Sequence, residues 1–379
     1  MQAKLSSSPA RPPAAEEFPA YPVSWYLFCR SRELDEKPLS QRILGRQLVA
    51  FRTASGQVAV MDGHCAHLGA DLGCGSVVGE TIRCPFHHWR YGTDGVCQSV
   101  PGAGQVPAFA RLRTYPVEER HGYVFFFNGG EPLFPLPFML DADPADFIAG
   151  EVFHYVADCT WFMNSAHAFD TQHFAAVHDR RLLAPPSVDC PAPFARRNSY
   201  RAEVIGQTIF DRILRAVAGR TVNITLTIWG GNIGVITADF GRVRSGFLMT
   251  MQPLENGQTL CHGIVYARRG QGLRGIFDAL NLWVRRLFTF GYLADEARRL
   301  RGTRYNPASL GPVDNDMIEY FQWAVSMPQS APSFTNPIVN EENDENFVRS
   351  SDVSVPGSPA CVVASATESA TASASAAGK

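Results

Sequence analysis

Two short stretches, Cys65-Ala66-His67 and Cys84-Pro85-Phe86-His87, decide the fold of the region that holds them. Sixteen residues separate them, and each stretch pairs one cysteine with one histidine. Two adjacent loops therefore offer two thiolates and two imidazoles. Zinc sites normally pair like with like, as C-x2–4-C and H-x3–5-H, so mixed pairs suit zinc poorly. The spacing predicts a metal centre of another kind.

An iron–sulfur cluster uses this set of donors. In a Rieske [2Fe–2S] centre two cysteines bind one iron and two histidines bind the other, and the histidines raise the reduction potential above that of an all-cysteine cluster. We therefore predict that Cys65, His67, Cys84 and His87 hold a [2Fe–2S] cluster. Such a cluster carries single electrons and does not itself activate a substrate. A second centre is expected to receive those electrons.

The composition sets the broad limits. A chain of 379 residues has room for two domains, and 45% hydrophobic against 18% charged residues can build substantial cores. The net charge of −2 gives the chain as a whole no general attraction to nucleic acid or anionic membranes. Nine cysteines spread along the chain do not form a disulfide scaffold, which favours a reducing, cytoplasmic location. We expect neither a signal peptide nor a transmembrane segment.

The organisation predicts an α+β protein with two folded domains between two tails. Residues 1–21 and 329–379 are rich in Pro, Ala and Ser and are expected to be disordered. Residues 22–130 show short apolar runs separated by turn residues, for example Leu48–Thr53 and Tyr123–Phe127, and are predicted to form an all-β domain. Residues 131–328 have a different pattern and form the second predicted domain.

Helical and strand patterns alternate in that second domain. Thr160–His178 is predicted to be a helix, and alternating apolar residues between 222 and 267 predict an antiparallel sheet. Leu273–Leu300 has the pattern of a long amphipathic helix with clustered arginines. A further helix is predicted from about Asp314 to Met327.

The second metal centre is predicted at the end of the first of these helices. Two neutral imidazoles and one carboxylate can hold a ferrous ion on one face and leave positions open for dioxygen. His173 and His178 are five residues apart, about 140° on a regular helix, so joint ligation requires a local distortion such as a π-type bulge. Asp170 lies one turn earlier and is expected to accept a hydrogen bond from the ring N–H of His173.

These motifs together resemble the catalytic subunit of the Rieske non-haem iron oxygenases. The resemblance covers about residues 22–328 and rests on C-x-H-x16-C-x2-H followed by D-x2-H-x4-H. It implies an N-terminal Rieske domain and a C-terminal helix-grip domain, in which a long helix crosses an antiparallel sheet. It also implies a homotrimer in which the cluster of one subunit serves the iron of its neighbour through Asp170. The stretch Cys84–Tyr91 resembles arylamine oxygenases of the aminopyrrolnitrin oxygenase type, and it includes His88, where the wider family more commonly has Gly.

The resemblance also implies a third iron ligand on a late helix. The segment 313–319 resembles the E-D-x-x-M-I-E pattern of the family, which predicts Asp314 as the ligand, with Asp316 and Glu319 as competitors. A cap at the start of the helix is the alternative role for Asp314. His167 lies one turn before Asp170, and its role stays open between a base, an extra ligand and a packed histidine.

The function predicted from these features is a terminal oxygenase. It would use O2 and electrons to oxidise a hydrophobic aromatic or polycyclic molecule, by N-oxygenation of an arylamine in secondary metabolism or by hydroxylation or oxidative cyclisation of a steroid-like ring. The chain lacks the C-x4-C-x2-C spacing of a ferredoxin, which implies a separate NAD(P)H-dependent reductase with or without a ferredoxin. A Rieske electron carrier and a helix-grip binding protein are the alternatives from other classes.

Overall fold

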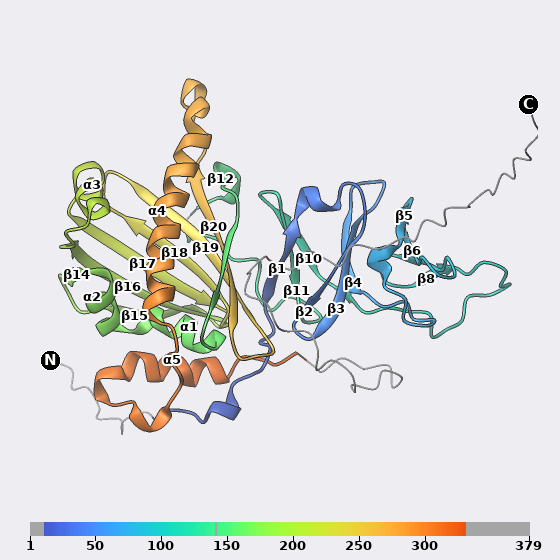
Figure 1. The fold of residues 1–379 in the computed structure, drawn as a ribbon, viewed down its shortest axis with the longest axis horizontal. Coiled ribbons are helices and arrows are strands. Elements are labelled where there is room, and N and C mark those ends of the chain that lie inside the picture. Colours follow the sequence, from blue (N-terminus) through green and yellow to red (C-terminus); the bar gives the residue numbers. More distant parts are fainter. Residues whose placement is uncertain (1–10, 141, 331–379) are drawn as a thin grey trace, which may run out of the picture. The chain divides into compact units, whose positions relative to one another are not determined.

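The computed structural model describes residues 11–140 and 142–330, and all of them fall in one compact unit of the chain (Figure 1). Short strands dominate up to residue 127, and a large sheet with helices follows. The architecture is α+β, as predicted from the sequence. The boundary expected near residue 130 stays a prediction.

The first part contains three small antiparallel sheets. Their strands, sheet by sheet and in spatial order, are β1 (Trp25–Arg30), β11 (Tyr123–Phe127) and β10 (Val117–Arg120); β2 (Leu39–Ile43), β3 (Arg46–Arg52), β4 (Val58–Asp62) and β9 (Thr114–Tyr115); and β5 (Ser76–Val78), β6 (Thr81–Arg83), β7 (Arg90–Gly92) and β8 (Cys97–Ser99).

The small sheets hold the cysteine–histidine loops through a shared core. Val49 and Phe51 of β3 and Met61 of β4 are buried in one hydrophobic cluster with Cys65 and Cys84. Burying apolar side chains against both loops stabilises them because apolar area is removed from water. Both cysteine–histidine stretches are thereby attached to a packed scaffold.

The second part is built on a nine-stranded antiparallel sheet. Its main path runs β12, β20, β19, β18, β17, β16, β14, while β13 also pairs with β20 and β15 with β16. The strands are β12 (Phe147–Ala149), β13 (Phe153–Ala157), β14 (Arg180–Leu182), β15 (Ser187–Ala192), β16 (Ala195–Val204), β17 (Thr221–Trp229), β18 (Ile233–Asp239), β19 (Arg244–Pro253) and β20 (Thr259–Arg268).

Five α-helices are present in the described residues, together with short 3-10 helices (η). The α-helices are α1 (Trp161–Ala166), α2 (Thr171–His178), α3 (Ile209–Val217), α4 (Asp278–Arg299) and α5 (Asn315–Val325). The 3-10 helices are η1 (Ala15–Glu17), η2 (Ser31–Leu34), η3 (Leu72–Cys74), η4 (Pro144–Asp146), η5 (His167–Phe169), η6 (Gly272–Phe277), η7 (Pro307–Ser309) and η8 (Pro312–Asp314).

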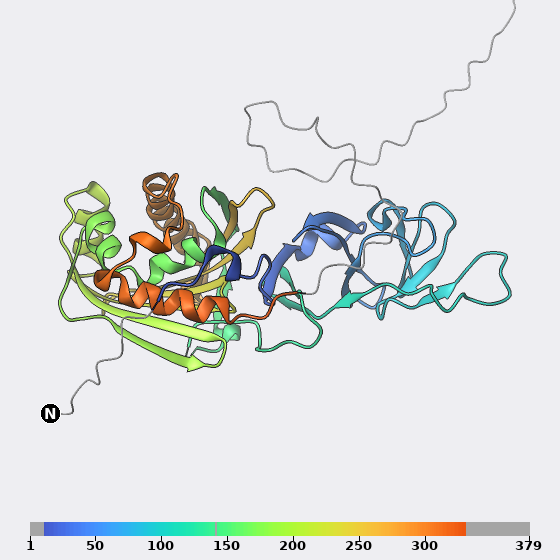
Figure 2. The same ribbon diagram turned by 90° about the horizontal axis from the view of Figure 1, so that it is seen from below.

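Helix α4 crosses one face of the large sheet, as Figures 1 and 2 show. Leu293 of α4 is buried against Phe153 of β13 and Val265 of β20. Strand alternation puts every second residue on this face, and Phe247 lies directly opposite Val265. A long helix gripped by an antiparallel sheet is the arrangement that the sequence predicted.

Two sequence predictions need correction. The helix expected over Thr160–His178 is interrupted at Asp170, whose extended backbone (φ −89°, ψ 101°) separates η5 from α2. The segment expected to be disordered up to residue 21 is packed from residue 11 onward. Phe18 stacks on Phe162 at 3.8 Å between ring centroids and is buried in the core around α1 and α5. One aromatic side chain anchors a stretch whose composition otherwise suggests disorder.

Candidate functional sites

The cysteine–histidine loops are shaped by backbone hydrogen bonds around each cysteine. The Cys65 N–H donates to the Ala70 carbonyl, and the Cys84 N–H donates to the Trp89 carbonyl, at 2.9 and 2.8 Å. Each loop therefore folds back on itself and turns its histidine toward the other loop. His88 has a positive φ of 59°, a conformation in which glycine meets least strain, and this accounts for the glycine more common there.

The four predicted cluster residues are arranged as two pairs. The Cys84 thiol lies next to the Cys65 thiol, and the rings of His67 and His87 lie 4.7 Å apart. Nδ1 of His67 is buried and has no hydrogen-bond partner among the described residues. Two thiols on one side and two imidazoles on the other, with a ring nitrogen left open, fit the two irons of a Rieske cluster.

Neighbouring aromatic side chains hold this group in place. The Trp89 ring stacks on His67 at 4.5 Å with planes 4° apart. The Tyr91 hydroxyl lies 3.1 Å from Cys65 Sγ. Burial raises the pKa of the Cys65 thiol, so the free thiol stays protonated and a bound metal would stabilise its thiolate form.

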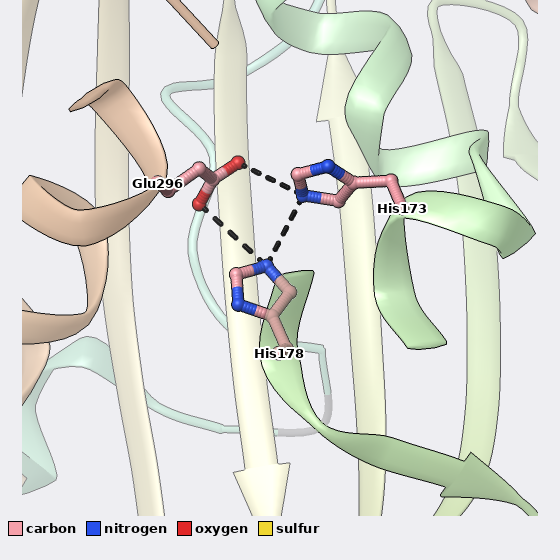
Figure 3. A group of neighbouring side chains, drawn as sticks. All are labelled: His173, His178 and Glu296. Atoms are coloured by element: carbon pink, nitrogen blue, oxygen red, sulfur yellow. Dashed lines mark hydrogen bonds and ion pairs between the residues drawn. The ribbon is translucent and has the colours of Figure 1, made fainter. Parts of the chain in front are cut away.

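A second group of potential ligands lies between α2 and α4 (Figure 3). His173 and His178 come from α2, and Glu296 comes from the last turns of α4. The Nε2 atoms of the two histidines are 3.1 Å apart. The Glu296 carboxylate oxygens lie 3.4 Å from His173 Nε2 and 3.9 Å from His178 Nε2. Two imidazoles and one carboxylate that converge in this way match the facial set that holds ferrous iron.

The pKa values of His178 and Glu296 favour the binding of a cation. Burial lowers the pKa of His178 to about 4, so its imidazole is neutral at pH 7 and offers a lone pair. Burial alone would raise the pKa of the Glu296 carboxyl, but the hydrogen bond from His173 and the neighbouring imidazoles outweigh it and lower the pKa. An ionised carboxylate beside the neutral His178 imidazole is a suitable start of a donor set for a divalent metal.

Each of the two histidines stacks on another ring. His167 lies against His173 at 5.1 Å between ring centroids, with planes 20° apart. Tyr292 of α4 lies against His178 at 4.1 Å, with planes 14° apart. Burial lowers the pKa of His167 to about 4. His167 therefore stacks on a ligand histidine beside the group of three and contributes no atom to that group.

The structure brings the two predicted histidines together without the expected π-type bulge. Thr171–His178 is α-helical, and Asp179 directly after it adopts a left-handed conformation (φ 50°, ψ 47°). His178 is thus the last helical residue, where no following turn restricts the side chain. Because α2 ends at His178, the two imidazoles meet without a distortion inside the helix.

Asp170 has a different partner from the one predicted. Its Oδ1 accepts a hydrogen bond from the backbone N–H of His173 at 2.9 Å, which makes it the N-cap of α2. The expected contact with the ring N–H of His173 is not among the hydrogen bonds of Asp170 that the structure shows. The carboxylate therefore fixes the start of the helix that carries both histidines. A role in electron transfer between subunits stays a prediction.

Asp314, predicted as the third ligand, lies outside the group of three that the structure brings together. Its Oδ2 accepts a hydrogen bond from the Gly311 N–H at 2.9 Å, at the turn that precedes α5. Of its competitors, Glu319 pairs with Arg196 at 2.7 Å, and Asp316 acts electrostatically on Tyr200. The late acidic motif therefore stabilises the start and the packing of α5.

Sequence reasoning missed Glu296. The sequence predicts the helix around it, but the resemblance to the family pattern places the acidic ligand in the later segment 313–319. A signal was present, since Asp295-Glu296 is the one acidic pair in a helix rich in arginine and apolar residues. Only the packing of α4 over α2 shows that Glu296 meets the histidines.

Comparison with known families identifies the first part of the chain. Residues 24–116 match the Rieske [2Fe–2S] domain family. This range contains all four predicted cluster residues, and their paired arrangement fits the cofactor. The chain therefore contains a Rieske [2Fe–2S] domain.

Relatives extend the similarity beyond this domain. The chain is 40% identical over 168 residues to aminopyrrolnitrin oxygenase of Pseudomonas fluorescens, covering 41% of this chain and 46% of that protein. It is 39% identical over 145 residues to cholesterol 7-desaturase of Xenopus laevis, covering 36% and 32%. A 3-ketosteroid-9-alpha-monooxygenase oxygenase component of Rhodococcus rhodochrous is 38% identical over 114 residues, covering 30% of each. The matches span less than half the length of these relatives.

Solved structures share the fold over most of the chain. NdmA of Pseudomonas putida CBB5 with caffeine matches with a TM-score of 0.59 at 20% identity, over 79% of this chain and 89% of that one. Apo dicamba monooxygenase matches with a TM-score of 0.56 at 18% identity, over 79% and 94%. The fold is therefore that of these proteins. Within residues 11–140 and 142–330, no helix has the length and apolar composition needed to cross a bilayer.

Proposed function

We propose that this chain is the terminal oxygenase component of a system that uses O2 and externally supplied electrons to oxidise a hydrophobic small molecule. One observation carries the proposal, which is the convergence of His173, His178 and Glu296 in a chain that also contains a Rieske domain. An electron carrier needs the cluster alone. A second set of three potential ligand atoms within 4.8 Å of one another has no purpose in such a carrier.

A mononuclear Fe(II) would be held by His173, His178 and Glu296. When bound, it would supply the coordination positions at which dioxygen is activated. Asp170 fixes the start of the helix that carries both imidazoles, and Tyr292 and His167 keep the two ring planes in place. Burial of the site excludes water and, by lowering the pKa of His178, keeps the His178 imidazole neutral.

The substrate is proposed to be a hydrophobic aromatic or polycyclic molecule. One face of the sheet carries four apolar side chains beneath the helices, Leu226, Ile236, Phe247 and Met249. Ile236 lies opposite both Leu226 and Phe247 on the neighbouring strands, and Met249 is two residues after Phe247 in β19. These side chains remain partly accessible although α2 and α4 cover this face. Apolar walls beside a few polar groups are typical of sites for apolar ligands. An arylamine and a steroid-like ring both fit this chemistry.

Electrons are proposed to come from a separate NAD(P)H-dependent reductase, with or without a ferredoxin. Leu68 and Phe86, which adjoin the two cluster histidines in sequence, are 65% and 61% exposed. Exposed apolar side chains beside a redox centre support docking of another protein. The same surface is compatible with the homotrimer implied by the family resemblance, in which clusters and irons of neighbouring subunits meet.

The test is anaerobic reconstitution with iron and a reductase, followed by exposure to O2 and mass spectrometry of arylamines and polycyclic compounds. Wild-type protein is expected to add oxygen to, or remove hydrogen from, at least one compound class. A His173→Ala variant that keeps its cluster spectrum is the matched control, and it should form no product. Turnover by this variant equal to wild type, or O2-independent turnover, would overturn the proposal. A cluster that is reduced and reoxidised normally without any mononuclear iron in wild-type protein would indicate an electron carrier.

A further inference from the structure

Helix α4 and the turn before it carry an uncovered apolar stripe. Its members are Ile276, Leu280, Trp283 and Leu287, which are 73%, 57%, 59% and 47% exposed. Phe277 lies beside them and is 60% exposed. Contiguous exposed apolar side chains of this size are uncommon on a soluble protein and mark a surface that contacts something apolar.

The stripe is distinct from the face that packs on the sheet. Its members are spaced by four, three and four residues, so they line one side of the helix. Leu293, which is buried against Phe153 and Val265, marks the side toward the sheet. Figure 1 shows the beginning of α4 extending past the ends of the strands. The stripe is therefore not part of the contact between α4 and the sheet, and it stays exposed.

Arginines surround the stripe. Residues 268–286 contain five arginines and one aspartate, a local net charge of +4 in a chain whose total is −2. The aspartate, Asp278, accepts hydrogen bonds from the Gly270 N–H and so belongs to the start of the helix. Arg285 reaches the Arg244 carbonyl on one flank of α4, and Arg286 reaches the Glu151 carbonyl on the other. Positive groups thus lie on both sides of the exposed apolar residues.

We propose that this stripe docks the protein on the surface of a bilayer that contains anionic lipids. An interfacial helix combines a Trp/Phe/Leu face, which enters the boundary between headgroups and acyl chains, with flanking Lys or Arg, which meet anionic headgroups. Trp283 supplies the amphipathic ring that favours this depth. Arginine stems lie along apolar surface while their guanidinium groups stay in the headgroup layer.

The charges favour a lipid surface over a second copy of this chain as the occupant. Two copies paired through the stripe would bring two segments of net charge +4 together, and like charges at a contact are unfavourable. An anionic bilayer instead neutralises them. This inference is independent of the proposed oxygenase activity, because it concerns another surface and another measurement.

The test is flotation of the full-length protein with vesicles of phosphatidylcholine alone and of phosphatidylcholine mixed with phosphatidylglycerol. Among the tryptophans of the described residues, Trp283 alone is a largely exposed one, so quenching of fluorescence by brominated lipid reports on it. The variant is Leu280→Glu/Trp283→Glu. The control is Val313→Glu, at a side chain that is 75% exposed outside the stripe. Circular dichroism and the cluster spectrum confirm that each variant is folded.

Wild type and Val313→Glu are expected to float with the anionic vesicles, with binding that is roughly tenfold weaker on phosphatidylcholine alone or at high salt. Brominated lipid should quench wild-type emission, and the double variant should lose binding. Absence of vesicle binding by wild type, or binding unchanged in the double variant, would overturn the proposal. So would light scattering showing that the double variant instead dissociates an oligomer, because the stripe would then be a contact between subunits.

Discussion

The two metal centres differ in how far apart their residues lie in the sequence. The cluster residues fall within 65–87 and come from two loops held by one small core. The proposed iron ligands come from α2 and α4, and seven of the nine strands of the large sheet lie between His178 and Glu296 in the sequence. A centre built from local loops is visible as spacing. A centre completed by a distant helix becomes visible only when the helix is packed.

The difference also concerns what supports each centre. Backbone hydrogen bonds at Cys65 and Cys84 fix the cluster loops directly. At the second centre, an N-cap and two stacked rings fix the imidazoles, and the packing of α4 delivers the carboxylate. We therefore expect changes at one centre to leave the other intact. Three of the four variants below test this separation and Phe18→Ala tests the packing of the N-terminal segment, from the largest expected effect to the smallest.

His178→Ala should cause the largest effect, a complete loss of mononuclear iron and of product formation. The reason is that two of three ligands cannot retain a divalent ion at a facial site. The visible and EPR spectra of the cluster should not change. Elemental analysis combined with these spectra measures both centres in one sample. A cluster lost together with the iron would show that the two centres are not independent.

His87→Cys should lower the reduction potential of the cluster by roughly 200 mV or more, because a thiolate donates more charge to iron than a neutral imidazole does. Spectroelectrochemistry measures the shift. His88→Gly is the matched control, since it changes the adjacent histidine at a positive φ of 59° and should leave the potential unchanged. If His88→Gly shifts the potential and His87→Cys does not, the ligand assignment in this loop is wrong.

Phe18→Ala should lower the free energy of unfolding by about 3 kcal/mol, the usual cost of removing a buried phenylalanine side chain. Phe18 packs on Phe162 and Tyr305, which belong to the helical part of the molecule. Phe86→Ala, at an exposed ring, should change it by less than about 0.5 kcal/mol. Chemical denaturation followed by near-UV circular dichroism compares them. Equal stability of both variants would refute the anchoring role of residues 11–21.

Tyr292→Leu should weaken Fe(II) binding about fivefold, because a stacked pair of rings contributes about 1 kcal/mol beyond the area it buries. Tyr292→Phe keeps the ring and should bind iron as wild type does. Iron titration of the apo protein measures the dissociation constant, and the ligand-field spectrum of Fe(II) reports the orientation of His178. An identical response of both variants would assign the effect to the hydroxyl group.

The sequence was sufficient for the fold class, the Rieske domain and the helix that carries His173 and His178, because each rests on local spacing or periodicity. The long helix was predicted as Leu273–Leu300, close to α4 with its preceding turn. The sequence favours Asp314 as the third ligand because it fits a linear motif, whereas the meeting of Glu296 with the histidines depends on a contact between two helices far apart in the chain. The prediction of disorder up to residue 21 was wrong from residue 11 onward for a similar reason. Composition does not show that Phe18 enters a core formed by later residues.

The central claim is that α4, and not the acidic motif before α5, completes the second centre. Iron content per chain, measured beside the cluster spectrum, tests it with Glu296→Gln, Asp314→Asn and Asp295→Asn. The account predicts that Glu296→Gln loses the mononuclear iron and keeps the two irons of the cluster, while Asp314→Asn retains all of them. Asp295→Asn, in the same turn of α4, should also retain them. Full iron content in Glu296→Gln, with loss of the mononuclear iron in Asp314→Asn or Asp295→Asn, would contradict the account.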